Sequence, residues 1–421
     1  MPGNDLFQNE FDGDTLLAAL PKQKPVEENP VTQLYSKDNA LSKASLHPYK
    51  YKFDADFVSA GLSNNILINR YQPYANGSLP IVLNNGSELN LTLGATVTDV
   101  LEDLKFVAGY RSGFSFSDND VYFSFQNQRR FIDWGLTYYR SKISNFPGFF
   151  RFDDIRSIYN NVMLSNLYQF NITYPIDEIK SVRLSGGLRR DRGVVRPANF
   201  IFGAPDSLGL KFKDSVANTA IARVEFVYDN TISKADNIWD GLRFKVYNEM
   251  YLPTETGSSI KGNKVFITGF DARYYYPIYK NFTWCVRAAG DMSYGDAYMI
   301  YYLGGVDGWL SPKANVNPQP SSNQQYLYQT LAVNMRGYTQ NLANGNNAVV
   351  INSELRLPVF TTFIKKPINN AFVRNFQLVQ FIDLGTAWNG GPNKIARPTV
   401  FYSPFSVTPN DIVPDPTNPV V

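Results

Sequence analysis

Apolar and polar residues alternate along most of this chain with a period of two, the spacing that is typical of β-strands. In segment 49–57, YKYKFDADF, aromatic or alanine residues fill the odd positions and charged residues fill the even ones. The same kind of alternation gives about thirteen predicted strands. They cover residues 49–57, 87–97, 105–114, 121–125, 131–139, 168–174, 182–188, 223–229, 242–251, 265–276, 282–290, 348–358 and 377–388.

The connections between these segments differ in length in an orderly way. Long connections cover residues 61–86, 141–165, 190–219 and 291–347, and short turns such as 98–103 lie between them. Long loops on one side and tight turns on the other are typical of outer-membrane barrels. Many segments alternate for nine residues or more, whereas strands of soluble sheets average ~5–6 residues. We therefore predict an all-β fold, an antiparallel transmembrane β-barrel with long extracellular loops.

A soluble β-sandwich or propeller is the alternative fold, because its strands also alternate. Aromatic residues crowd the predicted strand ends, however, as at Tyr274 to Tyr276, and this is typical of the girdles at a membrane interface. The best helical pattern is 153–164, within a connection. The chain divides into a polar linker at 1–48, an outer-membrane barrel at 49–388, and a loop or truncated tail at 389–421.

The composition narrows the range of functions. Aromatic residues make up 15% and charged residues 18%, and the latter is low against roughly 25% in soluble domains. A net charge of +3 without a dense basic run gives no indication of nucleic-acid binding. One cysteine, Cys285, and one histidine, His47, exclude disulfide frameworks, cysteine zinc clusters and most histidine metal sites. With no Gly-X-Ser-X-Gly motif, we expect no enzyme, no cofactor and no metal.

One arginine precedes a predicted strand within the long connection 291–347. Arg336 is followed by Gly337 and Tyr338, and the next two strands carry Glu354 and Asp383. If apolar side chains face lipid, both acids point into the lumen of the barrel. A guanidinium offers a planar fork that suits carboxylates, so an inward-folded loop would let Arg336 reach both acids.

These residues resemble the outer-membrane assembly and secretion superfamily that includes BamA, TamA and the two-partner secretion transporters. In that family an Arg-Gly-aromatic tip of the sixth loop folds into the lumen and pairs with acids on strands twelve and thirteen. By our count Glu354 is on the twelfth strand and Asp383 is on the thirteenth. The resemblance covers about residues 49 to 388. It implies a bacterial outer-membrane location.

Two features depart from the family pattern. The paired glycines that usually sit just before the Arg-Gly motif are Gly304 and Gly305, separated from Arg336 by the segment 311–325. Family barrels have sixteen strands, so we expect the final three strands to lie outside this sequence. The loop sequence also resembles a subgroup in which the barrel follows a TolB-like propeller, which would likewise lie outside this chain.

The resemblance implies that the first strand forms a seam that can open sideways. The apolar seam residues are expected to be Tyr49, Tyr51, Phe53 and Phe57. We expect the protein to assist insertion or translocation of polypeptides at the outer membrane. Its expected partners are outer-membrane lipids, client polypeptides, and a periplasmic propeller or accessory proteins. A passive pore is the alternative, because charged residues such as Lys50 and Asp54 would line a lumen in either case.

Overall fold

The computed structural model describes residues 49–62, 72–73, 90–113, 118–144, 159–197, 214–254, 264–306, 313, 315, 318, 320–321, 324–364, 366 and 368–391. Thirteen antiparallel strands form one continuous path, and β10 (Ile232–Ala235) pairs with β11 beside it to complete a 14-stranded sheet. The strands of the path are β1 (Phe53–Leu62), β3 (Asn90–Asp99), β4 (Leu104–Gly113), β5 (Asn119–Asn127), β6 (Asp133–Ser144), β7 (Tyr159–Asp177), β8 (Lys180–Pro197), β9 (Ser215–Asp229), β11 (Ile238–Pro253), β12 (Val265–Tyr279), β13 (Phe282–Gly295), β17 (Asn347–Pro358) and β18 (Gln377–Trp388).

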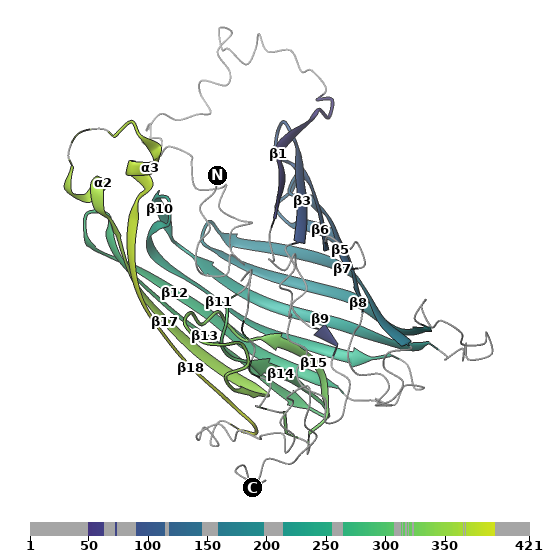
Figure 1. The fold of residues 1–421 in the computed structure, drawn as a ribbon. Coiled ribbons are helices and arrows are strands. Elements are labelled where there is room, and N and C mark those ends of the chain that lie inside the picture. The colour runs from purple at the N-terminus through teal and green to yellow at the C-terminus, as the bar shows by residue number, and fades with distance from the viewer. Residues whose placement is uncertain are drawn as a thin grey trace, which may run out of the picture.

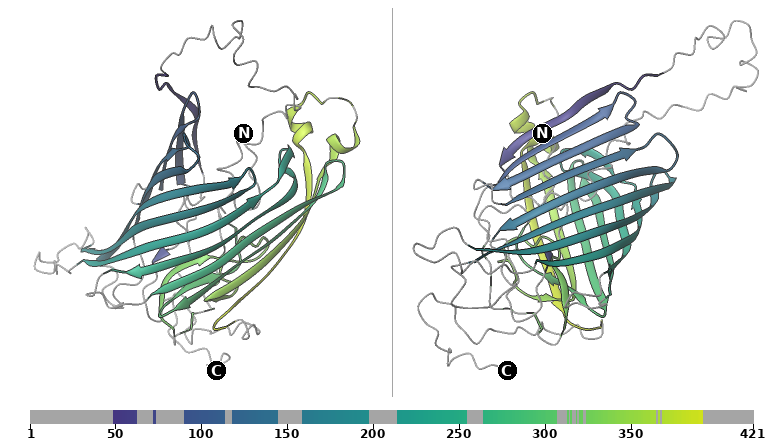
Figure 2. Two further views of the ribbon diagram at one scale, coloured as in Figure 1. Left: turned by 180° about the vertical axis from the view of Figure 1, so that it is seen from behind. Right: turned by 90° about the vertical axis from the view of Figure 1, so that its right-hand side faces the viewer.

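The sheet curves into an open barrel wall, with β1 and β18 at its two ends (Figures 1 and 2). Taken in chain order, each of the thirteen strands of the path pairs with the next of the thirteen, so the wall is an antiparallel meander. Within the described residues, β1 and β18 form no ladder with each other. The predicted all-β antiparallel architecture and the number of recognisable strands are confirmed.

Two local predictions were wrong. The helical pattern at 153–164 overlaps β7, which is a strand from Tyr159 onward because its residues pair with β8. The first strand does not cover 49–57 but starts at Phe53 and continues to Leu62. The register of β1 against β3 shifts between Ala55 and Phe57. A bulge of this kind reverses the face on which later residues lie, so the strict alternation of the sequence does not describe the whole strand.

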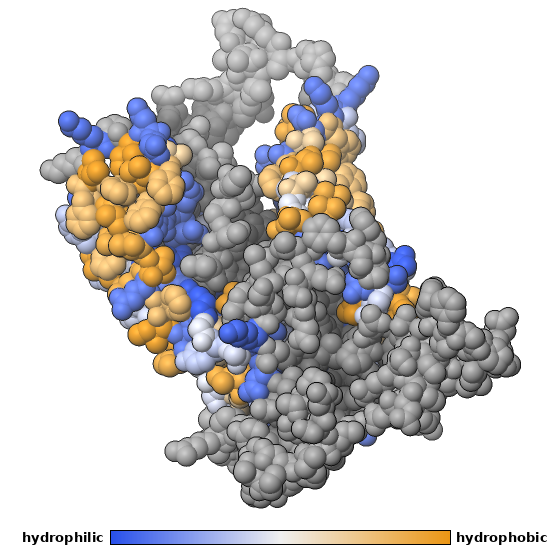
Figure 3. All heavy atoms as spheres, viewed as in Figure 1, coloured by the Kyte–Doolittle hydropathy of each residue, from blue (hydrophilic) through white to orange (hydrophobic). Residues whose placement is uncertain are grey.

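The outer face of the wall is apolar and exposed. Alternate residues along the strands point to this face, as the period of two requires. Exposed apolar side chains on it include Phe123, Leu136, Phe170, Leu184, Val224, Val246, Phe270, Ile351 and Leu384. Figure 3 shows such surface on the strands beside β1 and on the opposite end of the wall.

The inner face of the wall is charged and buried. Its largest fully buried side chains are arginines, namely Arg189, Arg243, Arg273, Arg287 and Arg356. Buried charges require ion pairs, and Asp271 accepts from two of these arginines. A wall that is apolar outside and charged inside has the reverse arrangement of a soluble domain, and it is the arrangement of a membrane barrel.

An aromatic band follows the outer face near the short-turn ends of the strands. Ring centroids are 5.6 Å apart for Phe53 and Phe106, 4.9 Å for Phe106 and Phe125, 5.5 Å for Phe125 and Trp134, and 6.3 Å for Trp134 and Phe170. The five rings come from β1, β4, β5, β6 and β7. Such a continuous row fits the aromatic girdle of a membrane interface.

A second, small sheet packs against the inner face of the wall. It contains β2 (Gln72–Pro73), β14 (Tyr298–Tyr302), β15 (Tyr326–Leu331) and β16 (Asn344–Gly345) in the order β16-β14-β15-β2. Three of these strands belong to the long connection between β13 and β17. The main apolar cluster forms where this connection meets the wall, and it includes Ile267, Met299, Leu303, Met335 and Val350. The long loop is therefore folded against the inner wall.

Two short helices, α2 (Val359–Phe363) and α3 (Ala371–Asn375), lie in the connection between β17 and β18. In the described part of the chain, no helix has the length and apolar character needed to cross a membrane.

Candidate functional site

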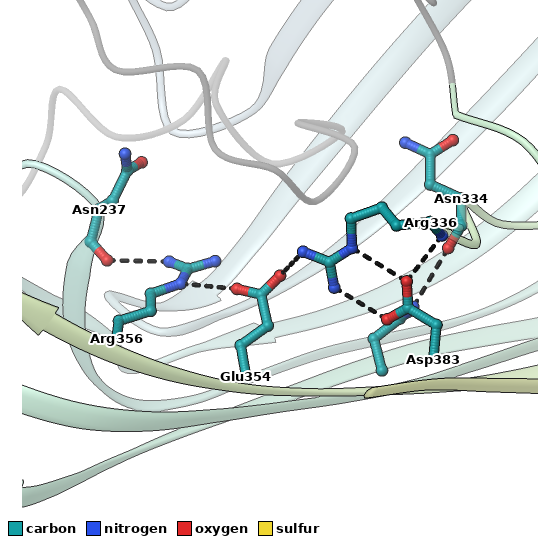
Figure 4. Close-up of polar contacts among 7 residues, drawn as sticks. Asn237, Asn334, Arg336, Glu354, Arg356 and Asp383 are labelled. Carbon is teal, nitrogen blue, oxygen red and sulfur yellow. Dashed lines mark hydrogen bonds and ion pairs between the residues drawn. The ribbon is translucent and has the colours of Figure 1, made fainter. Parts of the chain in front are cut away.

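The side chain of Arg336 joins the last two strands of the wall (Figure 4). Its Nε donates to Asp383 Oδ2 at 2.9 Å, and its Nη2 donates to Asp383 Oδ1 at 2.8 Å. The backbone N–H of Arg336 also donates to Asp383 Oδ2, at 2.8 Å. Nη1 donates to Glu354 Oε1. One guanidinium thus binds a carboxylate of β18 through its planar fork and a carboxylate of β17 through its remaining nitrogen.

Glu354 is shared with a second arginine. Arg356 Nε donates to Glu354 Oε2 at 2.8 Å, and Arg356 Nη1 donates to the carbonyl oxygen of Asn237 at 2.8 Å (Figure 4). Asn237 lies in the turn between β10 and β11. Arg336 and Arg356 balance the two carboxylates, and both acids are almost fully buried. This balance matters because a buried charge without a partner is strongly destabilising.

Two uncharged side chains, Asn352 and Phe381, also contact the ion-paired residues. Asn352 Nδ2 donates to Asp383 Oδ1 at 2.8 Å and to the carbonyl oxygen of Asn334 at 3.1 Å. The guanidinium carbon lies 3.9 Å from the centre of the Phe381 ring, a geometry suited to a cation–π interaction. Phe381 and Asp383 are two residues apart in β18 and therefore share a face.

The pKa of Arg336 is raised above its ordinary value. Partial burial alone would lower this pKa, but the hydrogen bonds and negative charges of Asp383 and Glu354 outweigh that effect. Arg336 therefore stays charged throughout the physiological pH range.

The backbone at Arg336 depends on the glycine that follows it. Gly337 has φ +83°, in the left-handed region, and a Cβ at this position would meet no atom within 4 Å. Glycine is therefore required by the backbone turn rather than by crowding. Tyr338 is exposed, and the residue of the tripeptide that binds the two acids is Arg336.

The paired glycines contact the Arg336 segment despite their distance in the sequence. Gly305 and Met335 form an antiparallel bridge, in which Met335 N donates to Gly305 O at 2.8 Å. Gly304 has φ +91° and lies so near to Thr339 that a Cβ would be 2.0 Å from its carbonyl oxygen. Segment 311–325 therefore does not separate these glycines from Arg336 in space.

The sequence reading missed a second attachment of the same loop. Tyr328 in β15 donates from its hydroxyl to Asp191 Oδ2 at 2.9 Å, and its ring lies 4.2 Å from the guanidinium carbon of Arg189. Both partners belong to β8. Burial and the Asp191 carboxylate raise the pKa of the Tyr328 phenol, so it remains a hydrogen-bond donor. No sequence signal marks Tyr328, because its partner lies more than a hundred residues away.

The predicted seam residues lie apart from this site. Phe53 and Phe57 are in β1, whereas Tyr49 and Tyr51 precede it, and all four side chains are exposed. The hydroxyl of Tyr49 donates to Asp99 Oδ1 of β3. Since β1 and β18 are the two ends of the strand order, the structure does not bring the seam residues to Arg336.

Among the described residues, no group of three or more His, Cys, Asp or Glu side chains could hold a metal ion. The linker at 1–48 with His47, and the tail from residue 392 onward, lie outside the described residues.

No protein-family model matches the sequence, and no curated protein matches it. In fold, this chain is similar to BamA and CdiB. The crystal structure of BamA from Haemophilus ducreyi lacking POTRA domains 1–3 matches with 13% identity and a TM-score of 0.45, covering 81% of this chain and 58% of that chain. CdiB from Acinetobacter baumannii matches with 11% identity and a TM-score of 0.41, covering 82% of this chain and 56% of that chain.

This chain therefore spans little more than half the length of each of these structures. The TolB-like propeller remains a prediction.

Proposed function

We propose that the protein is a bacterial outer-membrane barrel that assists insertion or translocation of polypeptides through a lateral seam. The single observation that carries this proposal is the attachment of an inner loop to β17 and β18 by Arg336. A passive pore would not need an inner loop that is attached to these two strands.

The first strand supplies the chemistry of the proposed seam. Within the described residues, β1 pairs only with β3, so its other edge presents backbone N–H and C=O groups. Edge strands of this kind pair with an incoming extended segment by backbone hydrogen bonds. This mode of binding requires neither a cofactor nor a catalytic group, because no covalent bond is made or broken.

Arg336 has a definite role in this proposal. It binds Asp383 on β18 and Glu354 on β17, so it acts as a lumenal brace that fixes β18 relative to β17. The loop glycines Gly304 and Gly305 fix the backbone on which Arg336 stands.

The apolar outer face and the aromatic band support a location in a lipid bilayer. Outer-membrane lipids are therefore proposed partners, together with client polypeptides and a periplasmic propeller or accessory proteins. We also propose that the chain is divided into a linker at 1–48, a barrel at 49–388 and a loop or truncated tail at 389–421.

The test is a folding assay in liposomes. The full-length protein is reconstituted, and the folding rate of a second, urea-unfolded barrel is followed. We expect the wild-type protein to accelerate folding and Arg336→Ala to lose most of that effect. Arg336→Lys should be intermediate, because lysine keeps the charge but not the fork.

Arg192→Ala is the matched control, since Arg192 pairs with Asp214 at an exposed site outside the brace. Its acceleration should equal that of the wild type. Steady ion conductance without acceleration, in wild type and Arg336→Ala alike, would instead favour the passive pore.

A further inference from the structure

The connection between β17 and β18 is unusual for its end of the wall. At this end, β7 and β8 are joined by residues 178–179, and β12 and β13 by residues 280–281. The connection 359–376 is far longer and contains α2 and α3. Figure 1 shows the two helices beyond the strand ends, beside β10.

The two helices expose large apolar side chains. Phe363 is 65% exposed, Ile364 46%, Phe372 77% and Phe376 39%. These four residues form what we call the α2–α3 patch, which is visible as apolar surface in Figure 3. Exposed apolar surface that gathers in one place indicates a binding surface for a membrane or a partner.

The patch is held in place by contacts on both sides. The rings of Phe360 and Phe376 lie 5.7 Å apart and join α2 to α3. Lys280 Nζ donates to the carbonyl oxygen of Thr362 at 3.0 Å, and this bond ties α2 to the turn between β12 and β13. The apolar side chains therefore stay outside the wall on a folded support.

The patch continues an apolar rim around the same end of the wall. Exposed apolar residues occupy each of the neighbouring short turns or strand ends, and examples are Leu101, Phe131, Ile176, Ile232 and Tyr279. The patch also adjoins the outer face of β18, where Leu378 is 55% exposed. An occupant of the patch would therefore also cover the outer face of the wall.

The charge of the connection points to an anionic occupant. Segment 359–376 contains Lys365, Lys366 and Arg374 and has no acidic residue. Exposed aromatic rings beside basic residues are typical of elements that lie in a membrane interface, where anionic headgroups attract the cations. The patch and the outer face of β18 form one continuous surface, and a bilayer would cover both.

We propose that the α2–α3 patch is embedded in the boundary between headgroups and acyl chains of the phospholipid leaflet on the short-turn side. The inference rests on the membrane location in the proposed function. The helices would anchor β17 and β18, the two strands that Arg336 joins, to this leaflet.

The experiment places a fluorescent bimane label on a cysteine in the full-length protein, with Cys285 replaced by serine. One protein carries Phe372→Cys in the patch, and the other carries Leu384→Cys on the outer face of β18. Each is reconstituted in phosphatidylcholine vesicles whose lipids carry bromine near the headgroup or deep in the acyl chain.

We expect shallow bromines to quench the label at residue 372 at least twofold more than deep bromines, and the reverse order at residue 384. Adding phosphatidylglycerol should strengthen the shallow quenching at 372, and Lys366→Glu with Arg374→Glu should remove that increase. Quenching at 384 but none at 372 would overturn the anchor and leave the proposed function standing. Quenching at neither position would overturn the membrane location itself, and vesicles of unbrominated phosphatidylcholine give the unquenched reference.

Discussion

The two ends of the wall differ in what supports them from inside. In β18, Asp383, Ala387 and Trp388 are buried beneath the inner loop. In β1, every residue except Ser59 is exposed. Both strands are paired on one edge only within the path. β18 has a folded loop behind it, whereas β1 is held by its ladder with β3 and by the ring contact of Phe53 with Phe106.

This comparison indicates that the two edges have different local stabilities. A strand with few buried contacts opens at a lower free energy than one inside a packed cluster. We infer that β1 is the edge that exchanges at the seam and that β18 belongs to the fixed part of the wall. The following changes test this difference, from the largest expected effect to the smallest.

Removing the guanidinium should have the largest effect. Arg336→Ala leaves two buried carboxylates without their common partner, and breaking such a pair costs about 3–5 kcal/mol. Hydrogen exchange of the β17 and β18 amides, measured in detergent micelles, should become faster by the factor that corresponds to this loss of free energy. The exchange rates of the β1 amides should not change. Equal acceleration in β1 would show that the brace stabilises the whole wall rather than one edge.

A matched pair of valines compares the two ends directly. Val350 in β17 is fully buried in the loop cluster, whereas Val58 in β1 is 72% exposed. Val350→Ala should lower the free energy of unfolding by about 2 kcal/mol through lost burial and a cavity. Val58→Ala should change it by less than about 0.5 kcal/mol. Urea unfolding in micelles measures both, and similar costs would remove the distinction between the ends.

The second loop attachment should contribute less than the brace. Tyr328→Phe keeps the ring over Arg189 and removes the hydroxyl that binds Asp191 and contacts Thr219 Oγ1 at 3.4 Å, at an expected cost of about 1.5 kcal/mol, mainly for the bond to the charged acceptor. The control is Tyr168→Phe, because Tyr168 is exposed on the outer face. Hydrogen exchange of the β15 amides should rise in the first variant alone.

The smallest effect is expected at Gly337. Gly337→Ala introduces a Cβ into open space but forces a non-glycine residue to φ +83°, which costs about 1 kcal/mol. Gly61→Ala in β1 is the control, since its Cβ also meets nothing within 4 Å and its φ is not in the left-handed region. If both alanines cost the same in urea unfolding, the turn does not constrain the loop.

The alternation of residues was sufficient to predict most of the wall. It located the strands and separated the faces, because side chains on a strand alternate by backbone geometry alone. The same rule placed Glu354 and Asp383 on the inner face, where both are buried. The contact of Arg336 with these acids was predicted by combining this rule with the resemblance to a known family.

The rest depended on contacts between distant residues. The bulge in β1 and the strand at Tyr159 were mispredicted because pairing with a neighbouring strand overrides a local pattern. The return of Gly305 to Met335 and the attachment of Tyr328 to Asp191 are long-range contacts with no local signature. The sequence alone thus determined which side of each strand is apolar. Only the tertiary structure decided what lies against the opposite, inner side, because the long loop is positioned by contacts with distant residues and not by its own sequence pattern.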